Sequence, residues 1–283
     1  MGQKSYEELA FRDDFMFCKI LGQDKQLCKE ILELILERKI KDIRYPETQK
    51  QIEITSDGKG IRLDVYAEDE EDNVYDVEMQ TVGNKNLPKR SRYYQGMIDL
   101  NLIERGADYK KLKKSFIIFI CTFDAFGKGL HKYTFENACR EEPSLTLQDE
   151  SVKIFLCTEG VKNDVSEQLL MFLRYVAGAK PEGELPERIE ERVGRARSRE
   201  EWRREYMTQQ MRDLENQEIG IELGKEIGIE LGKEIGVGLG EKARAVKTAQ
   251  TMLEQQEPLE KIVLYTGLSR EEIEELAGKR TSI

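Results

Sequence analysis

The sequence predicts an α/β fold, in which helices flank a mixed sheet and a helical extension follows at the C-terminal end. Short stretches of strand-like pattern and longer stretches with helical spacing follow one another in the order helix, three strands, helix, strand. Residues 187–217 are highly charged and helical in spacing, which predicts the extension. A mixed sheet covered by helices is the architecture that buries the apolar faces of such elements.

The N-terminal part of the chain predicts helices before the first strand. Residues 5–21 carry apolar side chains at helical spacing with an interruption near residues 12–14, and residues 24–38 carry one apolar stripe. The alternating residues 51–55 are expected to form the first strand, followed by a turn at 56–58.

An antiparallel hairpin is the most informative feature of the sequence. The acidic segment 68–73 is flanked by two stretches that alternate apolar and polar residues. With the loop centred near its middle, Asp64 faces Glu78 and Arg62 faces Gln80, so these four side chains share one face. The opposite, buried face is then expected to hold Leu63, Val65, Val77 and Met79.

The carboxylates of Asp64 and Glu78 would repel each other unless a cation or a proton lay between them. A divalent metal is therefore one explanation for the pair, and simple solvation on an exposed face is the other. The single histidine, His131, excludes His-rich zinc sites and most two-histidine centres, and its own role is expected to be structural. Carboxylates suit Mg²⁺ or Mn²⁺.

The residues after the hairpin predict the rest of the sheet and its helices. Residues 89–104 have roughly helical spacing, and the continuous apolar run 116–121 predicts a strand buried on both faces. Further strands are expected at 131–136 and 152–157, and a helix at 164–177.

The C-terminal part contains a repeat of eight residues. Two identical copies occupy 218–233 and a degenerate copy follows at 234–241, with glycine at every fourth position from Gly220 to Gly240. Glycine weakens both helix and strand, so we expect a weak helix that becomes ordered by self-association. The sequence therefore predicts a first domain at residues 1–180, a charged helical linker at 181–217, the repeat at 218–241 and a small helical interaction module at 242–283.

Composition and charge limit the classes of protein. No apolar run reaches the ~18 residues needed to span a bilayer, and no secretion signal opens the chain, so a cytoplasmic protein is expected. The five cysteines form no C-x-x-C pair and are expected to be reduced. The net charge of −10 argues against bulk attraction to nucleic acid. A local basic cluster follows the hairpin at Lys89, Arg90 and Arg92, and it has a second interpretation as a solvated helix face.

Several short motifs together resemble a known family. They are, in chain order, Asp14-Phe15-Met16-Phe17, Leu63-Asp64-Val65, Val77-Glu78-Met79-Gln80, Arg92-Tyr93-Tyr94 and Gly106-Ala107-Asp108-Tyr109. In order and spacing they resemble the Rpn recombination-promoting nucleases, transposase-like proteins of the PD-(D/E)XK nuclease superfamily, over roughly residues 10–125. The resemblance implies a restriction-endonuclease-like mixed sheet core (αβββαβ) flanked by helices.

The resemblance also implies roles for individual residues. Asp64 and Glu78 would bind Mg²⁺ or Mn²⁺ with the backbone carbonyl of Met79, and Asp14 would complete the site. Gln80 stands where the superfamily pattern has lysine, so it can only donate and accept hydrogen bonds. The basic residues of the following helix would contact DNA phosphates, namely Lys89, Arg90 and Arg92.

Three functions follow as hypotheses. The first is a metal-dependent DNA endonuclease associated with recombination, mobile elements or defence. The second is a catalytically weak or inactive nuclease-fold protein that acts as an oligomeric regulatory or interaction module through its C-terminal part. The third is a structural metal-binding protein.

Overall fold

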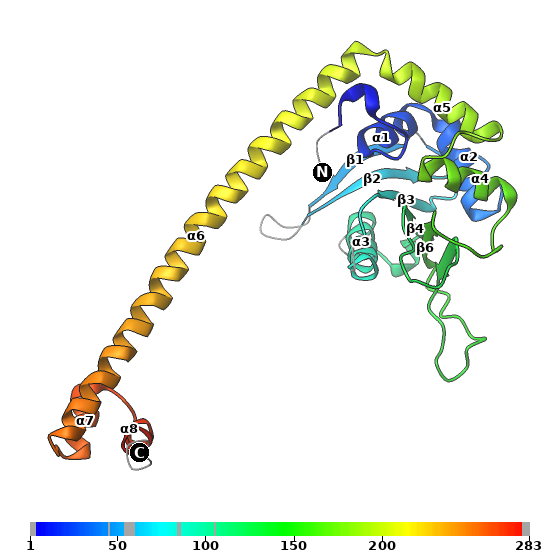
Figure 1. Ribbon diagram of the computed structural model, residues 1–283. Coiled ribbons are helices and arrows are strands. Elements are labelled where there is room, and N and C mark those ends of the chain that lie inside the picture. Colours follow the sequence, from blue (N-terminus) through cyan, green and yellow to red (C-terminus); the bar gives the residue numbers. More distant parts are fainter. Residues whose placement is uncertain (1–3, 45, 54–59, 84–85, 105, 279–283) are drawn as a thin grey trace. The chain divides into compact units, whose positions relative to one another are not determined.

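The computed structural model describes residues 4–44, 46–53, 60–83, 86–104 and 106–278. The chain divides into two compact units, Met1–Met207 and Thr208–Ile283. The first unit contains a mixed six-stranded sheet with helices on both faces (Figure 1). The predicted α/β class and the helical C-terminal part are therefore confirmed.

The sheet joins an antiparallel half to a parallel half. Its strand order is β1-β2-β3-β4-β6-β5, with β1, β2 and β3 antiparallel, β3, β4 and β6 parallel, and β5 antiparallel to β6. The strands are β1 (Glu47–Ile52), β2 (Ile61–Glu68), β3 (Val74–Gln80), β4 (Ser115–Cys121), β5 (Lys132–Phe135) and β6 (Ser151–Cys157). Every residue of the central β4 is buried, which explains its continuous apolar sequence.

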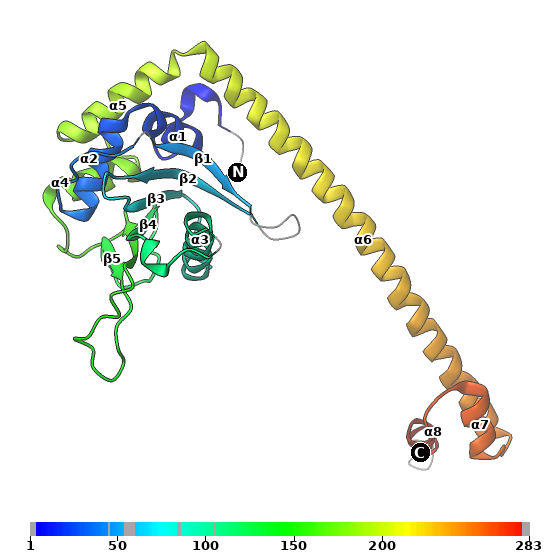
Figure 2. The ribbon, with the colours of Figure 1, turned by 180° about the vertical axis from the view of Figure 1, so that it is seen from behind.

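Two hydrophobic clusters cover the two faces of the sheet. The first packs the sheet against α1 (Asp14–Gln23), α2 (Lys25–Leu36), α4 (Glu167–Ala177) and α5 (Glu184–Arg197). The second packs the other face against α3 (Leu87–Leu102). Figure 2 shows the same two layers from behind.

The first strand lies earlier in the chain than predicted. It begins at Glu47 instead of Gln51 and is described to Ile52; residues 54 and 55 of the predicted strand and the predicted turn at 56–58 lie outside the described residues. The strand is mostly polar and only Ile52 is buried, because β1 is an edge strand. Its position is set by backbone pairing with β2, and hydrophobic periodicity does not record such pairing.

The first unit extends beyond the expected boundary at residue 180. Helix α5 contributes Ile189 and Val193 to the first hydrophobic cluster. Pro186 lies in the first turn of α5, where a missing N–H costs no helical hydrogen bond. The expected linker therefore contains residues of the core.

The repeat is helical, as predicted. It lies within α6 (Glu200–Glu254), which is followed by α7 (Leu259–Thr266) and α8 (Arg270–Gly278). In the second unit, α7 and α8 pack against the end of α6 through Ala249, Ile262 and Ile273. None of the described helices has the length and apolar character needed to cross a membrane.

Candidate metal centre

The pairing between β2 and β3 stops beside Asp64. Backbone pairs run from Glu68↔Val74 to Val65↔Val77, a register that places Asp64 level with Glu78, as predicted. The two carboxylates take the place of the backbone acceptors there. Asp64 N–H donates to Glu78 Oε1 at 2.9 Å, and Met79 N–H donates to Asp64 Oδ2 at 3.0 Å. These side chains therefore hold the two strands together at the point where the ladder opens.

The predicted buried face is wrong for one residue. Val65, Val77 and Met79 belong to the first hydrophobic cluster, whereas Leu63 belongs to the second, on the α3 side. Strict alternation would have kept Leu63 and Val65 on one face. The alternation breaks at Asp64, between them, which is also where the β2–β3 ladder ends.

The site collects buried carboxylates. Glu78 and Asp76 are fully buried and Asp64 is 8% exposed. Burial, together with the charges of Glu78 and Asp14, raises the pKa of Asp64. Burial raises the pKa of Glu78 as well, although the nearby Arg90 guanidinium opposes the shift. Removing charge from water is costly in this way unless opposite charge compensates.

Asp76 carries an unsatisfied carboxyl group. Neither of its oxygens has a hydrogen-bond partner among the described residues, although both are buried. Burial and the neighbouring Glu78 carboxylate raise the pKa of Asp76 well above its ordinary value. Two ionised carboxylates can only accept hydrogen bonds, so Asp76 and Glu78 can bond to each other only when one carries a proton.

Arg90 is the cation inside the site. Its guanidinium donates to Glu78 Oε2 at 2.5 Å, to Gln80 Oε1 at 3.1 Å and to the Tyr94 hydroxyl at 2.8 Å. The predicted DNA-contacting role of Arg90 therefore competes with an inward structural role. Lys89 and Arg92, the other two residues predicted to contact DNA, lie exposed on the same helix.

Gln80 links this arginine to the backbone at Met79. Its Nε2 donates to the Met79 carbonyl oxygen at 3.0 Å, while its Oε1 accepts from Arg90. The carbonyl predicted as a metal ligand is thus oriented by the side chain that follows it. A neutral amide can do this without adding charge.

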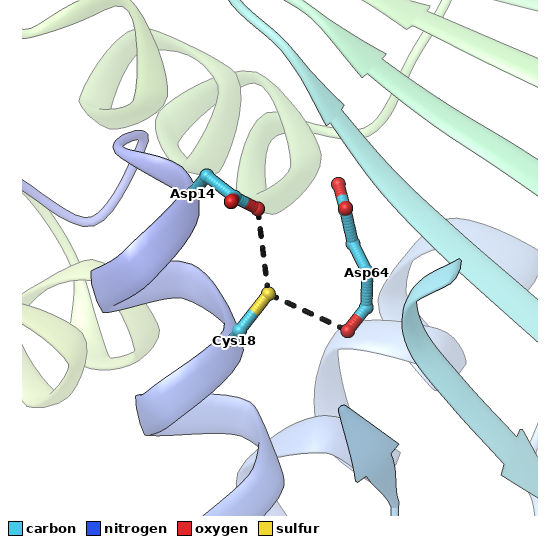
Figure 3. Close-up of side chains that lie close together, drawn as sticks. All are labelled: Asp14, Cys18 and Asp64. Carbon is cyan, nitrogen blue, oxygen red and sulfur yellow. Dashed lines mark hydrogen bonds between the residues drawn. The ribbon is translucent and has the colours of Figure 1, made fainter. Parts of the chain in front are cut away.

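Helix α1 brings Asp14 and Cys18 to Asp64 (Figure 3). A ligand atom from each of the three lies within 4.8 Å of the others, which is close enough to share an ion. The Cys18 sulfur lies 3.5 Å from Asp14 Oδ1 and 3.4 Å from the Asp64 carbonyl oxygen, and its single S–H can donate to either of them. Burial raises the pKa of this thiol. Hard divalent cations prefer oxygen to sulfur, so the two carboxylates are the ligands that suit such an ion. The guanidinium of Arg62 forms a longer ion pair with Asp14, with 3.9 Å between Nη2 and Oδ2.

The donor set fits a hard divalent cation. Asp14 and Asp64 bring carboxylate oxygens within 4.8 Å of each other, whereas Glu78 and Asp76 do not join this group of ligand atoms in the described part of the chain. Glu78 is instead bonded to Arg90 and to the Asp64 N–H. Carboxylate oxygens are the ligands that Mg²⁺ and Mn²⁺ prefer, so the Asp14–Asp64 pair is suited to such an ion.

Sequence reasoning missed three residues of this site. Asp76 stands two residues before Glu78, so the period of a strand would have placed both on one face. Cys18 stands four residues after Asp14, so helical spacing would have placed both on one side of α1. Gln49 contacts both Asp14 and Cys18, and no pattern in the sequence indicates this contact.

One comparison with known proteins gives a match. A family model described as PD-(D/E)XK nuclease family transposase matches residues 11–171, which include all of the acidic residues above. No curated protein and no solved structure matches the chain.

Proposed function

The chain belongs to the PD-(D/E)XK nuclease family transposases, and from that premise we propose that it is a metal-dependent endonuclease that hydrolyses phosphodiester bonds of DNA. The proposed setting is recombination, mobile elements or defence. The observation that carries the proposal is the gathering of Asp14, Asp64, Asp76 and Glu78 where β2 and β3 separate, with Arg90 as their cation. A solvated acidic face would not bury Asp76 and Glu78 completely.

In this proposal each residue has a defined task. Asp64, Glu78 and the Met79 carbonyl would hold Mg²⁺ or Mn²⁺, with Asp14 on α1 as a further ligand. When bound, such an ion polarises a phosphoryl oxygen and lowers the pKa of a coordinated water. Arg90 keeps the Glu78 carboxylate in place through its contacts with Gln80 and Tyr94.

Gln80 stands where the general superfamily pattern has lysine, and it can donate and accept hydrogen bonds but carries no positive charge. Its amide orients the Met79 carbonyl and could orient a nearby water, but it cannot offset negative charge. The proposed enzyme therefore depends on the ion and on Arg90 for positive charge.

DNA is the proposed partner, and Lys89 and Arg92 are the proposed contacts. Both are exposed on α3, the helix that also holds Arg90 against Glu78. Contacts of this kind bind phosphates and carry no sequence information. We therefore expect cleavage to tolerate different sequences.

The decisive experiment is a nicking assay on supercoiled plasmid. We expect the purified full chain to nick plasmid in Mg²⁺ or Mn²⁺ and to be inactive in excess chelator, with activity restored when the ion is added back. In the same assay, the double variant Lys89→Glu/Arg92→Glu should need a higher DNA concentration to reach its half-maximal rate, because two proposed phosphate contacts are replaced by negative charges. Cleavage that persists undiminished in chelator would contradict the proposal.

The alternative is a catalytically weak or inactive nuclease-fold protein that works through its C-terminal unit. The ion pair between Arg90 and the fully buried Glu78 favours it, because the site already contains a cation of its own. The alternative predicts no nicking with any divalent ion.

Self-association through the repeat is proposed for either function. Nine apolar side chains of the repeat are each more than half exposed: Ile219, Ile221, Leu223, Ile227, Ile229, Leu231, Ile235, Val237 and Leu239. Exposed apolar surface of this extent is typical of interaction sites. We expect Ile221→Glu/Ile229→Glu to lower the oligomeric mass measured by light scattering, whereas Glu222→Gln/Glu230→Gln should leave it unchanged. A wild-type chain that is monomeric at micromolar concentration would contradict this part.

A further inference from the structure

The backbone of β1 takes a left-handed conformation at Gln49. Its φ is 56°, although Thr48↔Val65 and Lys50↔Leu63 pair normally with β2 on either side. Residues with a Cβ are disfavoured in this region, and those found there are chiefly asparagine, aspartate and histidine. A glutamine held there inside a strand is thus a local strain that other contacts must compensate.

The strained residue lies directly across from the break in β2. The pair that would join Gln49 to Asp64 is missing between the two regular pairs. At Asp64, β2 also stops pairing with β3 and its side chains change faces. The distortions of β1 and β2 therefore meet at the residue that carries the proposed metal-binding carboxylate.

The side chain of Gln49 reaches α1 from this position. Its Nε2 donates to Asp14 Oδ1 at 3.3 Å and to Cys18 Sγ at 2.9 Å. The Cys18 thiol can donate either to the same Asp14 oxygen or to the Asp64 carbonyl, so the Gln49 amide is the donor available to Oδ1 in both cases. Within the described part of the chain, the other oxygen, Oδ2, is paired only with the Arg62 guanidinium, at 3.9 Å.

These contacts suit the orientation of a metal-binding carboxylate. Asp14 is 44% exposed in its side chain and would otherwise rotate among several conformers. An amide donor fixes one oxygen without adding a positive charge that would compete with a cation. Hydrogen bonds from a second layer of residues commonly orient metal ligands in this way.

We propose that Gln49 is a positioning residue for the proposed nuclease site. Its left-handed backbone aims the amide at Asp14 and holds that carboxylate toward Asp64. The inference rests on the proposed function for its effect on cleavage. Its effects on stability and on ion binding can be measured without cleavage.

Two substitutions distinguish the contribution of the Gln49 side chain from that of its backbone conformation. Gln49→Ala and Gln49→Gly both remove the amide, but only glycine tolerates φ near 56° without strain. We expect Gln49→Gly to melt about 2–4 °C above Gln49→Ala, the shift that relief of one left-handed residue gives in a domain of this size. Both should lower kcat by about 10- to 100-fold with little change in KM for DNA.

Ion binding gives the readout that is independent of cleavage. The Mg²⁺ concentration that half-saturates the rise in melting temperature should increase by about 10-fold or more in both variants. The matched control is Gln51, an exposed residue of the same strand whose φ is not positive. There glycine weakens the strand, so Gln51→Gly should melt below Gln51→Ala, and both should keep wild-type ion binding.

Each outcome decides a different question. Wild-type ion binding and kcat in Gln49→Gly would overturn the inference, because the amide would then be dispensable. If Gln49→Gly melted below Gln49→Ala, the backbone at position 49 would not be strained, and the inference that it aims the amide would be wrong. Absence of nicking by the wild type would count against the proposed function alone, provided that Mg²⁺ still raises the wild-type melting temperature.

Discussion

Replacing Asp64 by asparagine, or Glu78 by glutamine, should abolish ion-dependent cleavage while leaving a folded protein. Each change removes one proposed ligand but keeps the size of the side chain and an oxygen acceptor. A bound ion contributes several kcal/mol to a phosphoryl transition state, so its loss should lower the rate by about 10³-fold or more. The measurement is plasmid nicking with purified variants in Mg²⁺.

The melting temperature of Asp64→Asn gives a second test. In Asp64→Asn the amide oxygen can still accept the Met79 N–H, and a carboxylate that repels Glu78 and Asp14 is removed. We therefore expect Asp64→Asn to melt at or above the wild-type temperature without metal. Glu70→Gln is the matched control, because Glu70 is an exposed acid in the same hairpin that pairs with Lys41. Full activity in Asp64→Asn and Glu78→Gln would defeat the assignment of the site.

Replacing Arg90 by methionine should produce the largest loss of stability. It leaves Glu78, which is fully buried, without the guanidinium that donates to it at 2.5 Å. Breaking a buried ion pair by removing one partner typically costs about 3–5 kcal/mol. We expect a loss of this size in the free energy of unfolding, measured in urea without metal.

A double variant tests the cause of that loss. In Arg90→Met/Glu78→Gln the unpaired charge is gone, so most of the stability should return, since replacing both partners of a buried pair is often nearly neutral. Arg92→Met is the control on the same helix, and as an exposed site it should change stability by about 0.5 kcal/mol or less. If Arg90→Met matched the wild type, Arg90 would not be supporting Glu78.

The hairpin shows what a local pattern can predict. Alternation on both sides of an acidic segment placed Asp64 level with Glu78, and the register confirms it. The same reasoning failed at Leu63, because it assumed that alternation continues through Asp64. The break arises where β2 leaves β3 and faces the distorted Gln49 of β1, so it depends on a residue distant in the sequence.

Arg90 and Asp76 illustrate a second limit. On charge alone Arg90 belonged to an exposed basic cluster, but α3 turns it toward Glu78 while Lys89 and Arg92 remain exposed. Asp76 belongs to a stretch that alternates apolar and polar residues, which is typical of a half-exposed strand. It is buried because α3 covers that face of the sheet, and coverage by another element is not encoded in the alternation of one strand.

The sequence by itself determined the α/β class, most helices and strands, the hairpin register and the family, since these depend on short-range periodicity and motif order. The tertiary structure alone decided where the edge strand begins, which arginine enters the site and how Gln49 and Cys18 reach Asp14. These features result from contacts between elements far apart in the chain, where burial and hydrogen-bond geometry select one side chain from several of the same chemical type.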